Sequence, residues 1–136
     1  MIITRRAVML AAMAILFHPK AGAFDGLKPP EMVKRRPVVV LSPKRDNANV
    51  CTVVPLSTTP PKQIRVHHHA LPVGKYPFFD RIKPVWAKCD MTTCVSLARL
   101  DRMKLRGSYA NTFLHYNDLQ SIRLTLAEFL EITTKP

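Results

Sequence analysis

Apolar residues in the middle of the chain fall into short runs separated by proline-rich and polar segments, a pattern typical of strands. The run at 37–42 is continuous rather than alternating, as in a strand that is covered on both faces. The run at 51–56 is followed by polar residues and then by Pro60 and Pro61, which cannot continue a hydrogen-bonded ladder. The two runs are close enough in sequence to pair as a hairpin.

The segment 63–70 alternates between apolar and polar residues, with Ile64 and Val66 on one face, and this period predicts a half-exposed strand. Three successive histidines, 67–69, lie inside the segment. Neighbouring side chains of a strand point to opposite faces. We therefore do not expect the histidines to form one metal cluster.

A further strand is predicted at 85–91, after a loop at 72–84 that is rich in proline, basic and aromatic residues and is a candidate binding surface. The period of two places Trp86, Lys88 and Asp90 on one face of this strand. This polar face is the candidate functional face of the strand.

The last regular pattern predicts one helix, with Asn117 as its N-cap and Gln120 three residues later. Apolar residues then recur at helical spacing and are expected to face the core: Leu119, Ile122, Leu126 and Leu130. Several short strands and one terminal helix predict a small, mainly β, barrel-like fold.

Composition narrows the class of partner. The chain has 136 residues, enough for one domain, and its 21 Lys and Arg against 9 Asp and Glu give a net charge of +12. Such a surplus favours a polyanion, with nucleic acid ranked first and an anionic membrane or an acidic protein as alternatives. The three cysteines form neither a CxxC motif nor a zinc-binding spacing, so we expect no metal and no cofactor.

Five polar residues match the needs of metal-free RNA cleavage, in which the 2′-hydroxyl attacks the adjacent phosphorus. Asp90 is the candidate base, Lys88 the candidate acid or charge donor, and Arg36 offers a planar fork that fits phosphate oxygens. Ser57 and Thr58 are candidate hydrogen-bond donors to the same phosphate. The alternatives stay open: Lys88 and Asp90 as a structural ion pair, and Arg36 as a solvated strand flank.

The segments 31–43, 51–61 and 86–91 together resemble the PemK/MazF family of toxins of type II toxin–antitoxin systems, most strongly at 36–40 and 54–58. The resemblance implies a small SH3-like barrel, a homodimer and a sequence-selective endoribonuclease, an mRNA interferase that halts translation until an antitoxin binds it. The implied partners are single-stranded RNA, a cognate antitoxin and, through the antitoxin complex, operator DNA. No membrane partner is implied.

By position, the resemblance gives Arg36 the role of the family's catalytic arginine, Ser57 and Thr58 that of its hydroxyl pair, and Asp90 that of its later acidic residue. Family members often carry Arg at the position of Lys88 and Thr at that of Ser57. Lys cannot form the bidentate contact that Arg forms. The expected RNA contacts are Lys34, Arg35, Lys44, Arg45 and His67.

The chain departs from the family upstream of its Arg-Pro motif, where only 21–25 remain of the usual first strand. A missing strand would expose the hairpin that starts at 37 and remove part of the usual dimer and RNA surface. The alternative function is then a catalytically decayed member that binds nucleic acid or antitoxin without cleaving RNA.

Residues 1–30 are expected to precede a toxin domain at 31–136, and they permit two interpretations. Arg5 and Arg6, the apolar stretch 7–17 and the small residues 21–23 have the three zones of a secretory signal. In the second interpretation Met13 is the natural start, because 17–22 resemble the opening of one PemK/MazF subgroup. We favour the second interpretation and a cytoplasmic protein, with secretion as the alternative.

Overall fold

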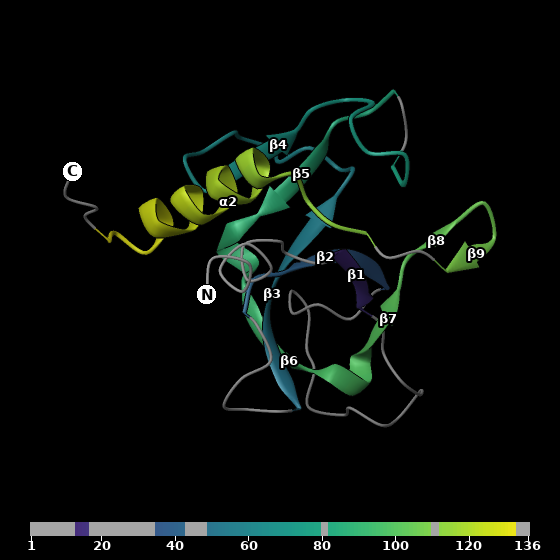
Figure 1. Cartoon of the computed structure of the whole chain (residues 1–136). Coiled ribbons are helices and arrows are strands. Elements are labelled where there is room, and N and C mark those ends of the chain that lie inside the picture. Colours follow the sequence, from purple (N-terminus) through teal and green to yellow (C-terminus); the bar gives the residue numbers. More distant parts are fainter. Residues whose placement is uncertain (1–12, 17–34, 43–48, 80–81, 110–111, 133–136) are drawn as a thin grey trace.

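The computed structural model describes residues 13–16, 35–42, 49–79, 82–109 and 112–132 (Figure 1). Several predictions fall outside these residues and concern the signal-like segment 1–12, the segment 21–25 and the side chains of Lys34, Lys44 and Arg45.

A seven-stranded antiparallel sheet forms most of the molecule, in the order β4-β5-β3-β2-β1-β7, with β6 also paired to β3. Its strands are β1 Met13–Leu16, β2 Arg36–Val40, β3 Val50–Ser57, β4 His68–Leu71, β5 Val85–Lys88, β6 Thr93–Ser96 and β7 Leu100–Arg102. The smaller elements are the 3-10 turns Cys89–Met91 and Leu97–Arg99 and the hairpin of β8 Lys104–Leu105 with β9 Ser108–Tyr109. The helix α2 spans Tyr116–Phe129.

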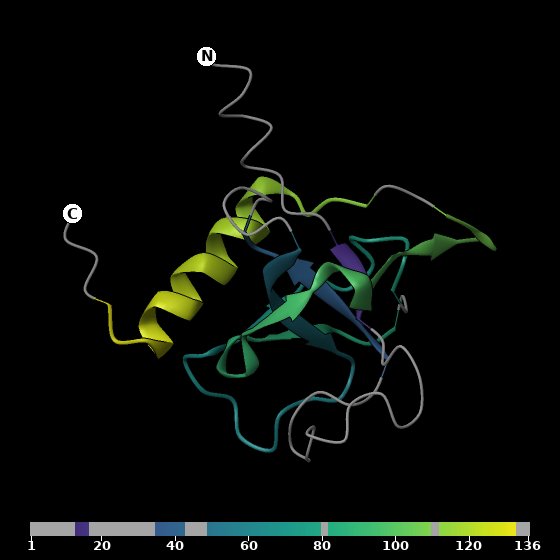
Figure 2. The same ribbon diagram turned by 90° about the horizontal axis from the view of Figure 1, so that it is seen from below.

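The predicted hairpin is confirmed, because β2 pairs antiparallel with β3 in a register that sets Val38 opposite Pro55. Strand β3 also changes partner along its length. It pairs with β6 through 50–53 and with β5 through Leu56 and Ser57. This change bends the sheet around its own core, as the two views in Figures 1 and 2 show.

Alternate strand residues fill two apolar clusters. The smaller contains the buried residues Val38, Cys51, Val53 and Val95. The larger lies on the side that α2 covers, where Leu119 and Ile122 are fully buried (Figure 1). The prediction of a mainly β fold with one terminal helix is therefore confirmed.

The helix differs from its prediction at both ends. It begins at Tyr116 with His115 in the N-cap position, so the proposed cap at Asn117 is wrong. Leu130 follows the last helical residue and is 55% exposed, so it lies outside the core stripe.

The predicted strand at 63–70 is wrong in its first half. Ile64 and Val66 are 67% and 68% exposed, and β4 begins only at His68, which is opposite Lys88 in β5. Strand β5 ends at Lys88 and continues as the 3-10 turn Cys89–Met91. The residues before His68 lie beyond the end of β5, so β5 offers them no strand residues to pair with. This explains why the alternating pattern predicted too long a strand.

The edge of β2 that a missing first strand would leave open is occupied by β1, upstream of 21–25. Met13 is opposite Val39 in β2, and Ala14 is opposite Arg102 in β7, so β1 is paired on both sides. The Met13 side chain is 3% exposed. The Thr112 Oγ1 donates to the Met13 carbonyl at 2.9 Å, and the Met13 backbone N–H donates to the Thr112 carbonyl at 2.9 Å.

A buried ionic network anchors the loop that precedes β5 to the first turn of α2. Tyr76 donates a hydrogen bond to Asp118, and Lys75 Nζ lies 2.8 Å from Asp118 Oδ2. The Asp118 side chain is only 8% exposed. Burial by itself raises the pKa of Asp118, but the hydrogen bonds from Lys75 and Tyr76 outweigh it and leave that pKa below its ordinary value.

Cutting the chain before or after β1 tests whether this strand is part of the fold. We expect a chain begun at Met13 to unfold cooperatively near the temperature of the full chain. A chain begun at 24 should lose at least about 3 kcal/mol, because it gives up a buried Met side chain and two strand pairings. Thermal unfolding followed by circular dichroism measures both. Equal midpoints would contradict the assignment of β1.

Replacing Asp118 by Asn tests the ionic network. At pH 7 the free energy of unfolding should fall by about 1–3 kcal/mol, because Lys75 and Tyr76 lose a charged acceptor. The depressed folded pKa means that this stabilisation is present above 3.8, the ordinary value, and is lost as the pH falls through the folded pKa. The difference in free energy of unfolding between the wild-type protein and Asp118→Asn should therefore vanish in acid.

Denaturant unfolding across the pH range measures that gap. Asp101→Asn is the control, because the Asp101 carboxylate accepts a local hydrogen bond from the backbone N–H of Arg102. If Asp118→Asn and Asp101→Asn lower the free energy of unfolding by the same amount at pH 7, Asp118 has no anchoring role.

Candidate functional site

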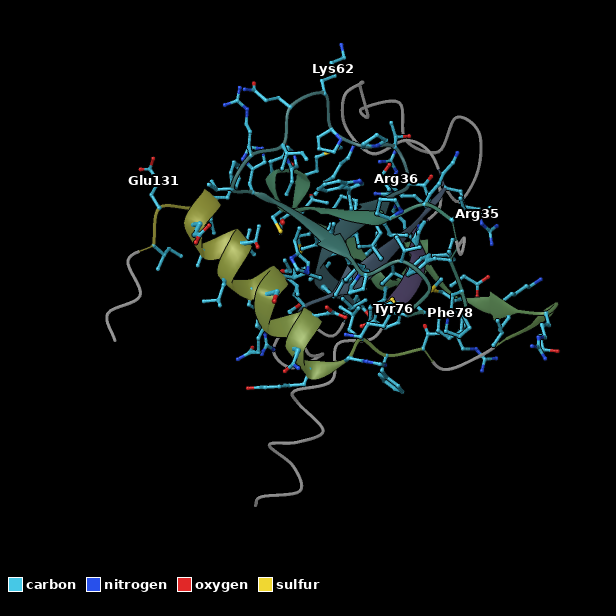
Figure 3. The ribbon with its side chains drawn as sticks, turned by 90° about the horizontal axis from the view of Figure 1, so that it is seen from above. Arg35, Arg36, Lys62, Tyr76, Phe78 and Glu131 are labelled. Atoms are coloured by element: carbon cyan, nitrogen blue, oxygen red, sulfur yellow. The ribbon has the colours of Figure 1, made fainter. Side chains whose placement is uncertain are left out.

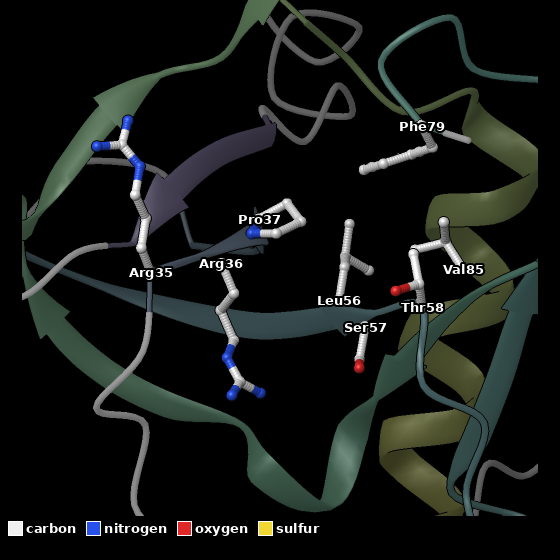
Figure 4. Close-up of a pocket in the computed structure, with 8 residues that line it drawn as sticks. All are labelled: Arg35, Arg36, Pro37, Leu56, Ser57, Thr58, Phe79 and Val85. Atoms are coloured by element: carbon white, nitrogen blue, oxygen red, sulfur yellow. The ribbon is translucent and has the colours of Figure 1, made fainter.

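The candidate site is a pocket of about 240 Å³ where β2 begins, β3 ends and β5 begins. We call it the strand-end pocket (Figure 4). It is lined by Arg35, Arg36, Pro37, Leu56, Ser57, Thr58, Phe79 and Val85. Three of the five residues predicted for catalysis, Arg36, Ser57 and Thr58, are thus brought together from two strands.

Strand register explains why Arg36 and Ser57 meet. Continuing the β2–β3 register by two residues from Val38 and Pro55 sets Arg36 opposite Ser57. Ser57 is in turn opposite Trp86 in β5. Directly opposite residues share a face of a sheet, so these three form one row across three strands. Figure 4 shows the side chains of Arg36 and Ser57 extending to the same side, with Arg35 directed away from Arg36.

Two hydrogen-bond donors in this row lack an acceptor. Arg36 Nε and Trp86 Nε1 are buried, and neither has a hydrogen-bond partner among the described residues. Both groups can only donate, and burying a donor without an acceptor is costly. Ser57 Oγ accepts from the Thr59 backbone N–H at 3.2 Å, which leaves its own proton to donate. The row therefore suits a ligand that supplies several acceptor oxygens, such as a phosphate.

Lys88 and Asp90 do not line the strand-end pocket. Lys88 is half-buried on β5, on the same face as Trp86 and two residues further along. Asp90 belongs to the 3-10 turn after β5 and is exposed, so the prediction that it continues the strand face is wrong. Its Oδ2 lies 3.6 Å from His67 Nε2, which gives it a partner other than Lys88.

His67, His68 and Asp90 form a cluster that the sequence did not predict. One ligand-type atom from each lies within 4.8 Å of the others, and the two rings are 4.2 Å apart. The expectation that successive histidines diverge is wrong for His67 and His68, because His67 lies in a turn before β4 rather than in a strand, whereas His69 is not part of this cluster. The Arg65 backbone N–H donates to His68 Nδ1 at 3.1 Å. Burial, together with the neighbouring His67, lowers the pKa of His68.

A second hollow of about 300 Å³ adjoins the first, and we call it the adjacent pocket. It is lined by Ile15, Arg35, Pro37, Phe78, Phe79, Arg102, Met103 and Lys104. Three of these residues, Arg35, Pro37 and Phe79, also line the strand-end pocket, so the two hollows are neighbours. Of the predicted RNA contacts, Arg35 is here, whereas His67 lies with Asp90.

Sequence reasoning did not single out Phe79, Trp86, Arg102 or Lys104 as site residues. The aromatic pair in the loop at 72–84 was the available signal for Phe79, and the polar face of β5 was that for Trp86. The basic residues of β7 and β8 carried no signal, because only the pairing of β1 with β7 brings them beside β2.

None of the helices in the described residues has the length and apolar character needed to cross a bilayer.

Comparison with known proteins agrees with this fold. The protein YifN of Escherichia coli (strain K12) is 38% identical over 137 aligned positions, which cover 82% of this chain and 91% of that protein. The Mycobacterium tuberculosis toxin MazF-mt6 superposes with a TM-score of 0.61 at 17% identity, over 90% of this chain and 99% of that one, which shows a shared fold. The family model of the PemK-like, MazF-like toxins matches residues 23–130. The chain therefore belongs to the PemK-like, MazF-like toxins of type II toxin–antitoxin systems.

Proposed function

We propose that the protein is a metal-independent endoribonuclease that cleaves single-stranded RNA through attack of a 2′-hydroxyl on the adjacent phosphorus. The observation that carries the proposal is the buried, unpartnered Nε of Arg36 in the strand-end pocket, beside Ser57. Membership of the toxin family and a net charge of +12 support RNA as the ligand.

The strand-end pocket holds the scissile phosphate in this proposal. Arg36 donates to the non-bridging oxygens, and its fixed charge stabilises the additional negative charge of the phosphorane. The hydroxyls of Ser57 and Thr58, which line the pocket, add donors without adding charge. The indole N–H of Trp86 lies outside the pocket lining, in the same cross-strand row as Ser57. Holding the phosphate in one orientation also places the 2′-oxygen in line with the leaving oxygen.

The reaction forms a bond from the 2′-oxygen to phosphorus and breaks the bond to the 5′-oxygen. Its products are a 2′,3′-cyclic phosphate and a 5′-hydroxyl. The proton of the 2′-hydroxyl needs an acceptor, and the leaving oxygen needs a proton. We assign the acceptor role to Asp90, which lies 3.6 Å from His67, and the role of charge or proton donor to Lys88, the last residue of β5.

Neither Lys88 nor Asp90 lines the strand-end pocket, and this favours one second candidate function. None of the residues that line the strand-end pocket is a carboxylate or a histidine. A protein that holds RNA in this pocket without a base would bind it and leave it intact. Such a binding module would keep the phosphate contacts and lack the chemistry.

The proposal includes neutralisation by a cognate antitoxin, for which an acidic segment suits the basic surface. It places the protein in the cytoplasm, where RNA is available. The burial of Met13 supports this choice, because removal of a signal ending at 23 would also remove β1.

Cleavage of a mixed-sequence RNA in excess EDTA tests the function. The wild-type protein should produce discrete fragments that end in a cyclic phosphate. Arg36→Ala should slow cleavage by about 10²–10³-fold, because removing one preorganised donor to a developing oxyanion costs that much. Ser57→Ala should slow it by a smaller factor, because Thr58 and Trp86 remain as donors.

Asp90→Asn tests the base separately, and Lys62→Ala is the control, because Lys62 projects from an exposed loop and lines neither pocket (Figure 3). Loss of cleavage in Asp90→Asn with retained RNA binding would support the assigned base. Full activity of Asp90→Asn would remove that role. Intact RNA with salt-sensitive binding by the wild-type protein would favour the binding module instead.

A further inference from the structure

The adjacent pocket combines aromatic side chains with cations. Phe78 and Phe79 are partly buried and pack against the larger apolar cluster, and Met103 is 4% exposed. The cations Arg35, Arg102 and Lys104 are exposed at the same pocket. None of the eight lining residues is acidic. Its volume of about 300 Å³ is at the lower end of the range for small-molecule sites.

Geometry connects this pocket to the strand-end pocket. Arg35 and Arg36 are consecutive residues at the start of β2, and their side chains extend in different directions (Figure 4). Arg35 lines both pockets. Arg36 lines only the strand-end pocket, and its Nε is the donor that has no partner among the described residues. Pro37 and Phe79 border both hollows. The two pockets are thus near enough for consecutive nucleotides of one chain to occupy them.

Single-stranded RNA matches this combination. Each nucleotide carries a flat base, which stacks on aromatic side chains, and a phosphate, which pairs with Arg or Lys. A duplex keeps its bases stacked inside the helix and cannot place one in such a pocket. An acidic peptide could pair with cations of this pocket, but it would offer Phe78 and Phe79 no flat ring to stack on.

We propose that the adjacent pocket binds the nucleotide next to the scissile phosphate, with its base against Phe78 and Phe79 and its own phosphate facing Arg35, Arg102 and Lys104. The inference rests on the proposed function for the position of the scissile phosphate. It adds a subsite that selects the base beside the cut. The loop carrying Phe78 is positioned by the contact of Tyr76 with Asp118.

Binding and cleavage are measured separately to test this subsite. A single-stranded RNA with every 2′-hydroxyl methylated cannot be cleaved, so its affinity, followed by fluorescence anisotropy in EDTA, reports binding alone. Phe78→Ala should weaken that affinity roughly tenfold, the usual loss when one stacking side chain is removed. Phe113→Ala is the matched control, because Phe113 is 48% exposed and lines neither pocket.

A second variant keeps the test valid if Phe78→Ala fails to fold. Phe78→Leu retains an apolar side chain but lacks the aromatic face, so it should still weaken binding several-fold. Lys104→Ala should lower the slope of log affinity against log salt by about one, as expected for one lost phosphate contact. Sequencing of the ends produced from mixed-sequence RNA should show a changed base preference next to the cut in Phe78→Leu.

The outcomes separate this subsite from the proposed function. Weakened binding by Phe78→Leu together with a wild-type protein that cleaves no RNA would uphold the subsite and overturn the ribonuclease. The subsite would be overturned, and the ribonuclease left standing, if Phe78→Leu bound the methylated RNA as tightly as Phe113→Ala does and kept the base preference of the wild type. Binding of duplex RNA as tight as that of single-stranded RNA would also overturn it.

Discussion

The register between β2 and β3 is the constraint on which the candidate site depends. It sets Val38 opposite Pro55 and, two residues further on, Arg36 opposite Ser57. A slip by one residue would turn Arg36 to the other face of the sheet and bury the wrong set of valines. The register is held from both faces, because Val38 packs in the smaller apolar cluster and Val39 in the larger one. Packing of two cores thus fixes the position of a charged group at the end of the strand.

The change of partner along β3 extends this constraint to β5. Only the last two residues of β3 pair with β5, and Ser57 is one of them. Ser57 is therefore the residue at which two strand pairings meet, with Arg36 on one side and Trp86 on the other. Both neighbours carry a buried donor that has no acceptor within the part of the chain that the structure describes, which is the feature that makes this row a candidate for ligand binding. Arg36, Ser57 and Trp86 all belong to strands of the sheet, so their relative positions follow from strand pairing.

Sequence patterns predicted the parts of the structure that local spacing controls. The apolar runs of β2 and β3 and the helical stripe at Leu119 and Ile122 were identified from spacing alone. Apart from the two ends of the helix, the errors occurred where a distant partner decides the outcome. The alternation before His68 lacks a strand to pair with, and Asp90 turns away because β5 ends at Lys88. The resemblance to known toxins identified Arg36, Ser57 and Thr58, but no local pattern indicated that Arg102 and Lys104 lie beside Arg35.

The position of β1 affects when the fold can be completed during synthesis of the chain. Residues Met13–Leu16 leave the ribosome early, whereas Thr112, which bonds to Met13 across a separation of 99 residues, follows near the end. The sheet therefore cannot close until most of the chain has been made. Until then β1 is an exposed apolar segment, and the adjacent pocket, which Ile15, Arg102 and Lys104 help to line, is incomplete. A ribonuclease assembled in this order would be harmless to the messenger and ribosome that are producing it, and an antitoxin would have time to meet it before the fold is complete.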